Sequence, residues 1–81
     1  MKLIYEETLS DSVCKEAAVE LWATGVSGEE TIMLPYLIAW EQVDADGEIK
    51  RGFSALAGLT KFEAIRAAVE LLNSIKSEVG L

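Results

Sequence analysis

The sequence predicts a small α+β domain of two layers, in the order β-α-β-β-α, with helices packed on one face of a three-stranded sheet. Three observations lead to this class. A segment near the C-terminus opens with a helix-capping motif, two β-prone segments flank an Asp-Ala-Asp-Gly turn, and an earlier segment has apolar residues at helical spacing. Residues 1–81 are expected to form a single domain, because a chain of this length supports one small core.

The first part of the chain is expected to hold a strand followed by a helix. Lys2–Glu7 is short and rich in residues that favour strands. In Asp11–Thr24, a rotation of about 100° per residue places most of the apolar side chains on one half of a helix. Gly25 is suited to end this helix in a left-handed conformation. Cys14 lies in the middle of the apolar half, which predicts a buried and unreactive thiol.

The middle of the chain is expected to form a β-hairpin. Its strands are Tyr36–Val43, with Thr31–Leu34 as an extension, and Glu48–Ala57. Pro35 cannot donate a ladder hydrogen bond, so we expect it at a strand start, an edge or a bulge. Gly52 lies inside the second strand and is a candidate for a β-bulge.

The stretch "VDADGEIK", Val43–Lys50, contains the residue types of a calcium-binding loop. In the EF-hand alignment, however, Gln42 stands in place of the first aspartate and Phe53 in place of the bidentate glutamate. The flanking segments are also expected to be strands rather than helices. Asp-Ala-Asp-Gly between two apolar strands is typical of a hairpin turn in which Gly47 supplies a positive φ. We therefore expect a turn at this position and no metal site.

The clearest element is a C-terminal helix over Lys61–Ser77, because Thr60 and Glu63 form a T-x-x-E capping box before it. Its polar residues fall within an arc of roughly 100°, which leaves an apolar arc about twice as wide as that of an ordinary surface helix. We expect one side to pack on the sheet and the other on a helix, either the first helix or a copy from a second subunit. The polar residues are Glu63, Arg66, Glu70, Asn73, Ser74 and Ser77.

The residue inventory argues against catalysis. Histidine is absent, which removes the commonest general base and the usual zinc ligands. The adjacent acids Glu6–Glu7 and Glu29–Glu30 would point to opposite faces of an extended chain. We expect a protein that is not an enzyme and that carries no cofactor or metal. One cysteine and an N-terminal sequence unlike a signal peptide or membrane span favour a cytoplasmic location.

Composition instead favours binding to another protein. Hydrophobic residues make up 51% of the chain, which is much apolar surface for a small core. The leading expectation is a protein-interaction module, acting as a homodimer through an apolar helix or sheet face. The formal net charge of −7 disfavours direct nucleic-acid binding. The alternative is a phage-type acidic inhibitor that partly imitates DNA toward a nucleic-acid-processing enzyme.

Four residues are the expected partner contacts. Tyrosine and tryptophan are favoured as interface anchors, and the strand that holds Tyr36 and Trp40 is apolar on both faces. At least one of these two rings is therefore expected to face outward or into a partner. Phe62 and Val69 belong to the wide apolar arc of the C-terminal helix and are the expected contacts there.

The segment "GLTKFEAIRAAVELL", residues 58–72, resembles two families. In HicB-type antitoxin domains a hairpin leads into a helix with the pattern G-x-T-x-x-E-A, and double-stranded-RNA-binding domains end in a similar way. The resemblance covers less than half of the chain. The Pro-Asp-Leu-Pro-Gly turn of the first family is absent. The basic residues that begin the helix in the second family are almost all missing. No family is assigned on this basis.

Overall fold

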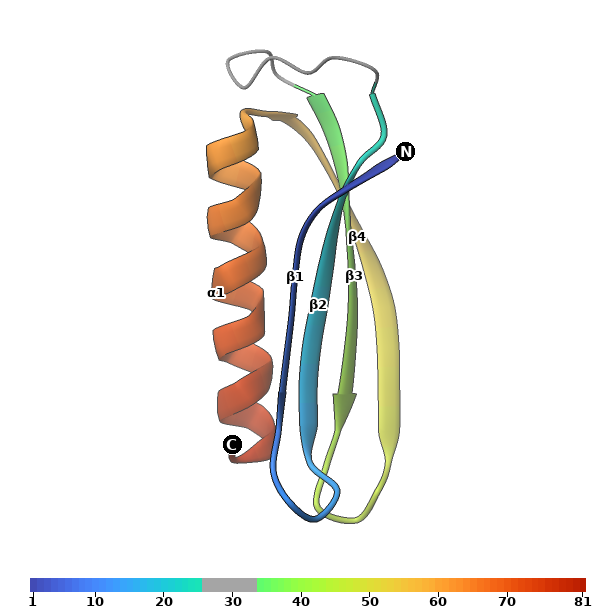
Figure 1. The fold of residues 1–81 in the computed structure, drawn as a ribbon, viewed down its shortest axis with the longest axis vertical. Coiled ribbons are helices and arrows are strands. Elements are labelled where there is room, and N and C mark those ends of the chain that lie inside the picture. The colour runs from blue at the N-terminus through green and yellow to red at the C-terminus, as the bar shows by residue number, and fades with distance from the viewer. Residues whose placement is uncertain (26–33) are drawn as a thin grey trace.

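A computed structural model describes residues 1–25 and 34–81 of the chain (Figure 1). In them, four strands and one helix follow one another in the order β-β-β-β-α: β1 (Lys2–Ser10), β2 (Glu16–Ala23), β3 (Leu34–Val43), β4 (Ile49–Leu59) and α1 (Lys61–Val79). The strands form one antiparallel sheet in the order β1-β2-β3-β4. The predicted order β-α-β-β-α with a three-stranded sheet is therefore wrong. The expected connection after Gly25 and the strand extension at Thr31–Met33 lie outside the described residues.

The error concerns β2, which replaces the helix expected over Asp11–Thr24. Ala17, Val19, Leu21 and Ala23 are all buried, and the residues between them are not, which is the alternation of a strand. The helical spacing is satisfied by a partly different set, Val13, Cys14, Ala17, Ala18, Leu21 and Trp22, to which Val19 does not belong. Alanine, leucine and glutamate also favour helices. Strand pairing decides between helix and strand here, because β2 forms hydrogen-bonded ladders with β1 on one side and with β3 on the other.

Cys14 consequently lies in a turn and not in a helix. The Asp11 carboxylate accepts hydrogen bonds of 3.0 Å from the backbone N–H groups of Val13, Cys14 and Lys15, which closes the β1–β2 connection. The Cys14 thiol donates to the carbonyl oxygen of Ala45 at 3.2 Å, in the β3–β4 turn. The half-buried thiol thus links the two hairpin turns at one end of the sheet.

The predicted hairpin turn between β3 and β4 is confirmed. The N–H of Gly47 donates to the carbonyl oxygen of Asp44 at 3.0 Å, and Gly47 has a φ of +80°. The Asp44 carboxylate also accepts from the N–H groups of Asp46 and Glu48. A register shift falls at Pro35, between Leu34 and Tyr36, as the missing N–H predicted.

The predicted capping box of α1 is also confirmed. The Thr60 hydroxyl accepts from the Glu63 N–H at 3.2 Å, and the Glu63 carboxylate accepts from the Thr60 N–H at 3.0 Å. Gly80 ends the helix in a left-handed conformation with a φ of +79°. No helix in the part of the chain that the structure describes is long and apolar enough to cross a membrane.

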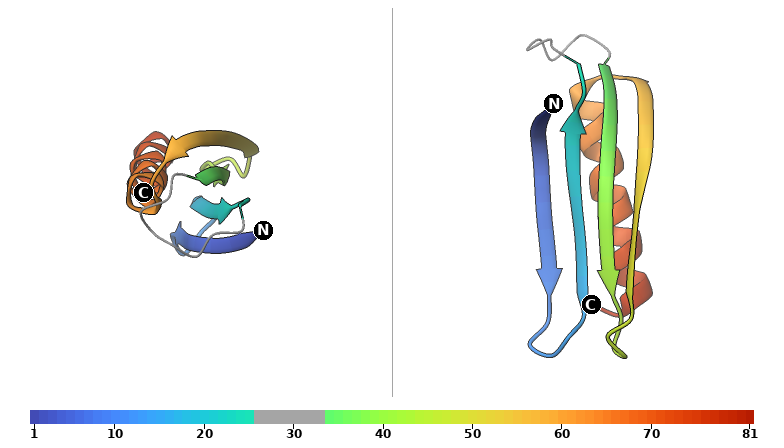
Figure 2. Two further views of the ribbon diagram at one scale, coloured as in Figure 1. Left: turned by 90° about the horizontal axis from the view of Figure 1, so that it is seen from above. Right: turned by 90° about the vertical axis from the view of Figure 1, so that its right-hand side faces the viewer.

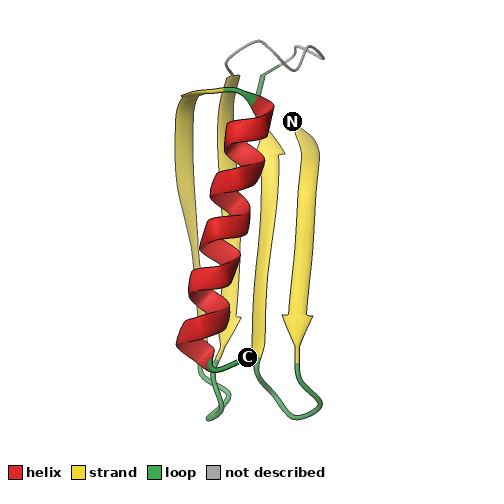
Figure 3. Cartoon of the chain, turned by 90° about the vertical axis from the view of Figure 1, so that its left-hand side faces the viewer, coloured by secondary structure: helices red, strands yellow, loops and turns green. Residues whose placement is uncertain are grey.

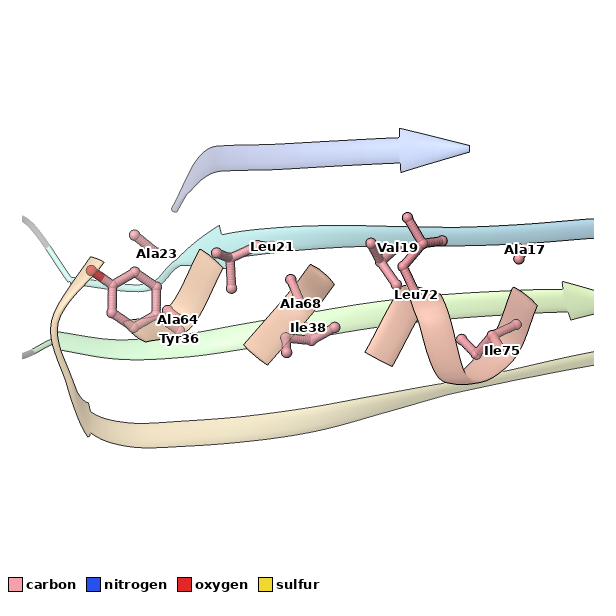
Figure 4. Close-up of a cluster of buried hydrophobic side chains, with 10 residues drawn as sticks. All are labelled: Ala17, Val19, Leu21, Ala23, Tyr36, Ile38, Ala64, Ala68, Leu72 and Ile75. Atoms are coloured by element: carbon pink, nitrogen blue, oxygen red, sulfur yellow. The ribbon is translucent and has the colours of Figure 1, made fainter. Parts of the chain in front are cut away.

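The core lies between α1 and the helix-facing side of the sheet (Figures 3 and 4). Each buried helix residue follows the previous one by three or four positions, so they form one stripe: Ala64, Ala68, Leu72, Ile75 and Val79. This stripe packs on alternate residues of β2 and β3, among them Val19, Leu21 and Ile38. The second helix that was expected beside α1 is not present among the described residues, because its segment forms β2.

Candidate functional site: the uncovered face of the sheet

The helix covers one face of the sheet, and no described element covers the other (Figure 2). Side chains that are direct partners across antiparallel strands share a face, so the strand register identifies the residues of the uncovered face. We call this surface the open face. It consists of Leu3, Glu6, Thr8 and Ser10 of β1, Glu16, Ala18, Glu20 and Trp22 of β2, Leu37, Ala39, Glu41 and Val43 of β3, and Ile49, Arg51, Phe53 and Ala55 of β4.

One half of the open face is apolar. Leu3 pairs with Trp22, Trp22 with Leu37 and Leu37 with Ala55, so these four residues form one row across all four strands. Phe53 adjoins this row on β4 and is 75% exposed. Singly exposed apolar residues are common on protein surfaces, whereas a contiguous group that includes two aromatic rings is typical of an interaction site. We call the four residues the apolar row.

The other half of the open face is acidic and hollowed. A hollow of about 310 Å³ lies above β1, β2 and β3. Its charged lining consists of four glutamates, Glu6, Glu16, Glu20 and Glu41. Thr8, Ala18 and Ala39 are its other open-face residues. Short side chains between longer acidic ones account for the depression. We call this feature the glutamate hollow.

The carboxylates of the glutamate hollow interact with one another. The pKa of Glu16 is raised above its ordinary value, chiefly by a hydrogen bond with Glu41 and then by burial. The pKa of Glu41 is lowered, first by the same hydrogen bond and then by the Arg51 guanidinium, whose Nε lies 2.6 Å from a Glu41 oxygen. Arg51 is the one basic residue at the open-face positions given above. The negative charge of this half is therefore only partly neutralised.

Among residues 1–25 and 34–81, no group of three or more acidic or cysteine side chains could hold a metal ion. The Cys14 thiol lies at the hairpin turns, where it donates to backbone carbonyls. What the open face offers is an apolar row for packing and a hollow of carboxylates for electrostatic contact. Such a surface is suited to binding.

The four expected partner-contact residues are placed differently by the structure. Tyr36 is 3% exposed and belongs to the core, so the outward-facing ring expected of the Tyr36–Trp40 pair is not Tyr36. Trp40 is half-buried and also faces the helix side, packed against the core. Phe62 is 75% and Val69 36% exposed on α1. Whether Phe62, Val69 or Trp40 touches a partner stays a prediction.

The residues of the open face escaped the sequence analysis because of β2. The helix predicted over Asp11–Thr24 places Trp22 on its apolar half and Glu16 and Glu20 on the other half, so it does not group these three residues. In a strand, the even-numbered positions from Glu16 to Trp22 all share one face. Alternation along Glu48–Ala57 puts Phe53 and Ala55 on one strand face, but whether that face is covered depends on the other elements, and the described ones leave it uncovered.

Comparisons of the chain with protein-family models, with curated proteins and with solved structures find no significant match.

Proposed function

We propose that this protein is a non-enzymatic protein-interaction module that binds its partner through the open face. The observation that carries the proposal is Phe53, which is 75% exposed beside the apolar row, on the sheet face that no described element covers. A partner that covers this surface would remove the ring and the row from water together, and the hydrophobic effect favours such burial.

The apolar row has the features of an interface centre. Trp22 lies in the row and Phe53 lies beside it, and both are aromatic; the cross-strand partner of Phe53 is the short residue Ala39. Aromatic anchors at the centre of an interface often contribute more than about 2 kcal/mol each, which corresponds to roughly thirty-fold in Kd. The polar residues around the row would form the rim of the interface.

A matched pair of phenylalanines tests the proposal. Phe53 on the open face and Phe62 on α1 are both 75% exposed. Replacement of either by serine should leave the fold intact, because exposed substitutions usually change stability by less than about 0.5 kcal/mol. Tagged wild-type protein, Phe53→Ser and Phe62→Ser are each used to capture binding proteins from a lysate, and the captured proteins are identified by mass spectrometry.

We expect a protein that is captured by the wild type and by Phe62→Ser and lost with Phe53→Ser. If capture is lost with Phe62→Ser but not with Phe53→Ser, the binding surface lies on the helix and not on the open face. Capture that neither substitution changes would contradict the proposal. Thermal melts of both variants show that each remains folded.

Homodimer formation, expected from the sequence, is a second candidate, and the exposure of Phe62 and Val69 favours it. These residues are seven positions apart on α1 and so share one side of the helix. The open face is less suited to a dimer, because each copy carries four glutamates there. The side of α1 near Phe62 and Val69 instead carries a pair of opposite charges, Arg66 and Glu70, 3.4 Å apart. Light scattering at increasing concentration tests this, with a dimer expected for the wild type and a monomer for Phe62→Ser.

The acidic inhibitor is favoured by the glutamate hollow, because four carboxylates gather on three neighbouring strands. If the protein is such an inhibitor, the partner that the wild type captures and Phe53→Ser does not capture should bind duplex DNA. Added duplex DNA should then displace this partner from the protein. A partner that holds DNA and this protein at the same time would contradict imitation of DNA.

A further inference from the structure

We propose that the partner presents a basic, amphipathic polypeptide segment to the open face, with its apolar side chains on the apolar row and its lysine or arginine side chains over the glutamate hollow. This inference rests on the proposed function, since it names the chemistry of the segment that the open face binds.

The charge of the open face favours this occupant. Four glutamates line the hollow, and Arg51, paired with Glu41 at 2.6 Å, is the basic residue at the open-face positions. The whole chain has a formal net charge of −7, so the long-range field has the same sign as the local one. A basic segment would be attracted as it approaches and would meet carboxylates when it arrives.

The hollow also has a suitable size. Its volume of about 310 Å³ lies at the lower end of the range for small-molecule sites, roughly 300–1,000 Å³. It therefore suits one or two long side chains better than a whole ligand. Ala18 and Ala39 provide apolar surface between the acids, and the methylene stems of lysine and arginine pack well on such surface while their charged ends reach the carboxylates.

The crowding of the carboxylates supports a cationic occupant independently of size. Glu16 and Glu41 both line the hollow, and the Glu41 carboxylate raises the pKa of Glu16, as expected where two negative charges lie close together. A guanidinium between them would relieve this repulsion, and its planar fork can donate to two carboxylates at once.

Other occupants fit less well. A second copy carries the same four glutamates and the same net charge of −7, so like charges oppose its approach to this face. Nucleic acid would be repelled by the same carboxylates. An acidic or neutral polypeptide would leave the hollow uncompensated.

The test is a selection of binders from a random 12-residue peptide library displayed on phage. The wild-type protein is immobilised, and enriched peptides are synthesised together with counterparts in which every lysine and arginine is replaced by glutamine. Binding is then measured to the wild type and to Phe53→Ser. It is also measured to Glu6→Gln/Glu20→Gln, and to the helix control Glu70→Gln/Glu78→Gln. Both double variants remove two negative charges and keep side-chain shape.

We expect enriched peptides that combine basic and apolar residues and that bind Phe53→Ser weakly. Glu6→Gln/Glu20→Gln should raise the Kd at least about three-fold, while the helix control changes it by less than about two-fold. Added salt should weaken binding to the wild type more than to the open-face double variant.

The two proposals fail differently. Peptides that need Phe53 but lack basic residues, or that bind Glu6→Gln/Glu20→Gln as tightly as the wild type, would overturn the basic-segment inference and leave the proposed function standing. Peptides that bind Phe53→Ser as well as the wild type, or a selection that enriches nothing, would count against both.

Discussion

The indole ring of Trp40 lies against Gly52, its direct partner on the adjacent strand. A β-carbon placed on Gly52 would stand 2.6 Å from Cζ2 of this ring, which is closer than non-bonded carbons approach. The register of β3 and β4 is regular here, so the bulge that Gly52 suggested in the sequence is absent at this position. The glycine is explained by the space that the indole needs.

Gly52→Ala is therefore expected to displace Trp40 and to destabilise the fold by about 1–3 kcal/mol, the usual range for overpacking. Ser54→Ala, at the next helix-facing position of the same strand, should change stability little because Ser54 is exposed. Chemical denaturation of the three proteins measures this. The combination of Gly52→Ala with Trp40→Leu should be less destabilised than the sum of the two changes. Simple additivity would show that the ring and the glycine are not coupled.

The sequence predicted the parts of the fold that depend on local chemistry. The capping box of Thr60 and Glu63, the turn at Gly47 and the shift at Pro35 all follow from which hydrogen bonds a residue can make, and neighbours along the chain suffice to show them. The segment around Val19 could not be assigned in this way. Different subsets of its apolar residues satisfy the two periods, and the decision between them comes from pairing with β1 and β3, which are separate segments of the chain.

A pair of lysine substitutions in β2 distinguishes the strand from the expected helix. Ala17 is fully buried under α1, whereas its neighbour Ala18 lies on the open face, directly opposite Glu41. Ala17→Lys should unfold the protein, because the core would have to accept an unpaired charge. Ala18→Lys should remain folded, with its ammonium group near Glu41. In a helix both positions would have belonged to the apolar half. Circular dichroism melts test this, and similar behaviour of the two variants would contradict the strand.

Stability in acid should depend on the capping box. The pKa of Glu63 is lowered from its ordinary value of 4.5, first by the hydrogen bond from the Thr60 N–H and then by that from the Thr60 hydroxyl. A carboxyl whose pKa is lower in the folded state stabilises the fold above its unfolded pKa, and this stabilisation is lost as the pH falls through the folded value. The melting temperature of the wild type should therefore drop as the pH is taken below about 4.5.

Glu63→Gln keeps an acceptor for the cap but does not titrate, so its melting temperature should fall less over the same acid interval. Some acid sensitivity should persist, because the pKa of Asp11 is also lowered, chiefly by the Val13 N–H. Glu78→Gln removes one exposed carboxyl from the same helix without changing the cap, and it should follow the wild type. A Glu63→Gln curve that also follows the wild type would show that the capping box does not set the acid response.

The candidate site was harder to predict than the fold, for a physical reason. Whether Phe53 and Trp22 are buried depends on how many elements cover each face of the sheet, which no local pattern encodes. Tyr36, by contrast, was expected to contact a partner but is buried. Its ring could occupy either face of an apolar strand, and the structure places it under α1 with the core. Once β2 is known to be a strand, the alternation of its residues identifies the open face.

The last prediction concerns α1, on which the core depends. Leu72 is 3% exposed and packs within the core, while Glu70 is exposed and its carboxylate lies 3.4 Å from the Arg66 Nε. Leu72→Glu should unfold the protein, because lost leucine packing alone removes about 2–5 kcal/mol and the carboxylate would be buried without a partner. That loss is a large share of the roughly 5–15 kcal/mol that stabilises a typical domain.

Glu70→Ala should change the free energy of unfolding by less than about 0.5 kcal/mol, because exposed ion pairs of this spacing contribute little. Thermal melts and size-exclusion chromatography of the two variants test both expectations together. A Leu72→Glu variant that melts and elutes like the parent would mean that α1 does not pack on the sheet through this stripe. The sheet would then lack the covered face from which the open face is distinguished, and Phe53 and Phe62 would no longer form a matched pair.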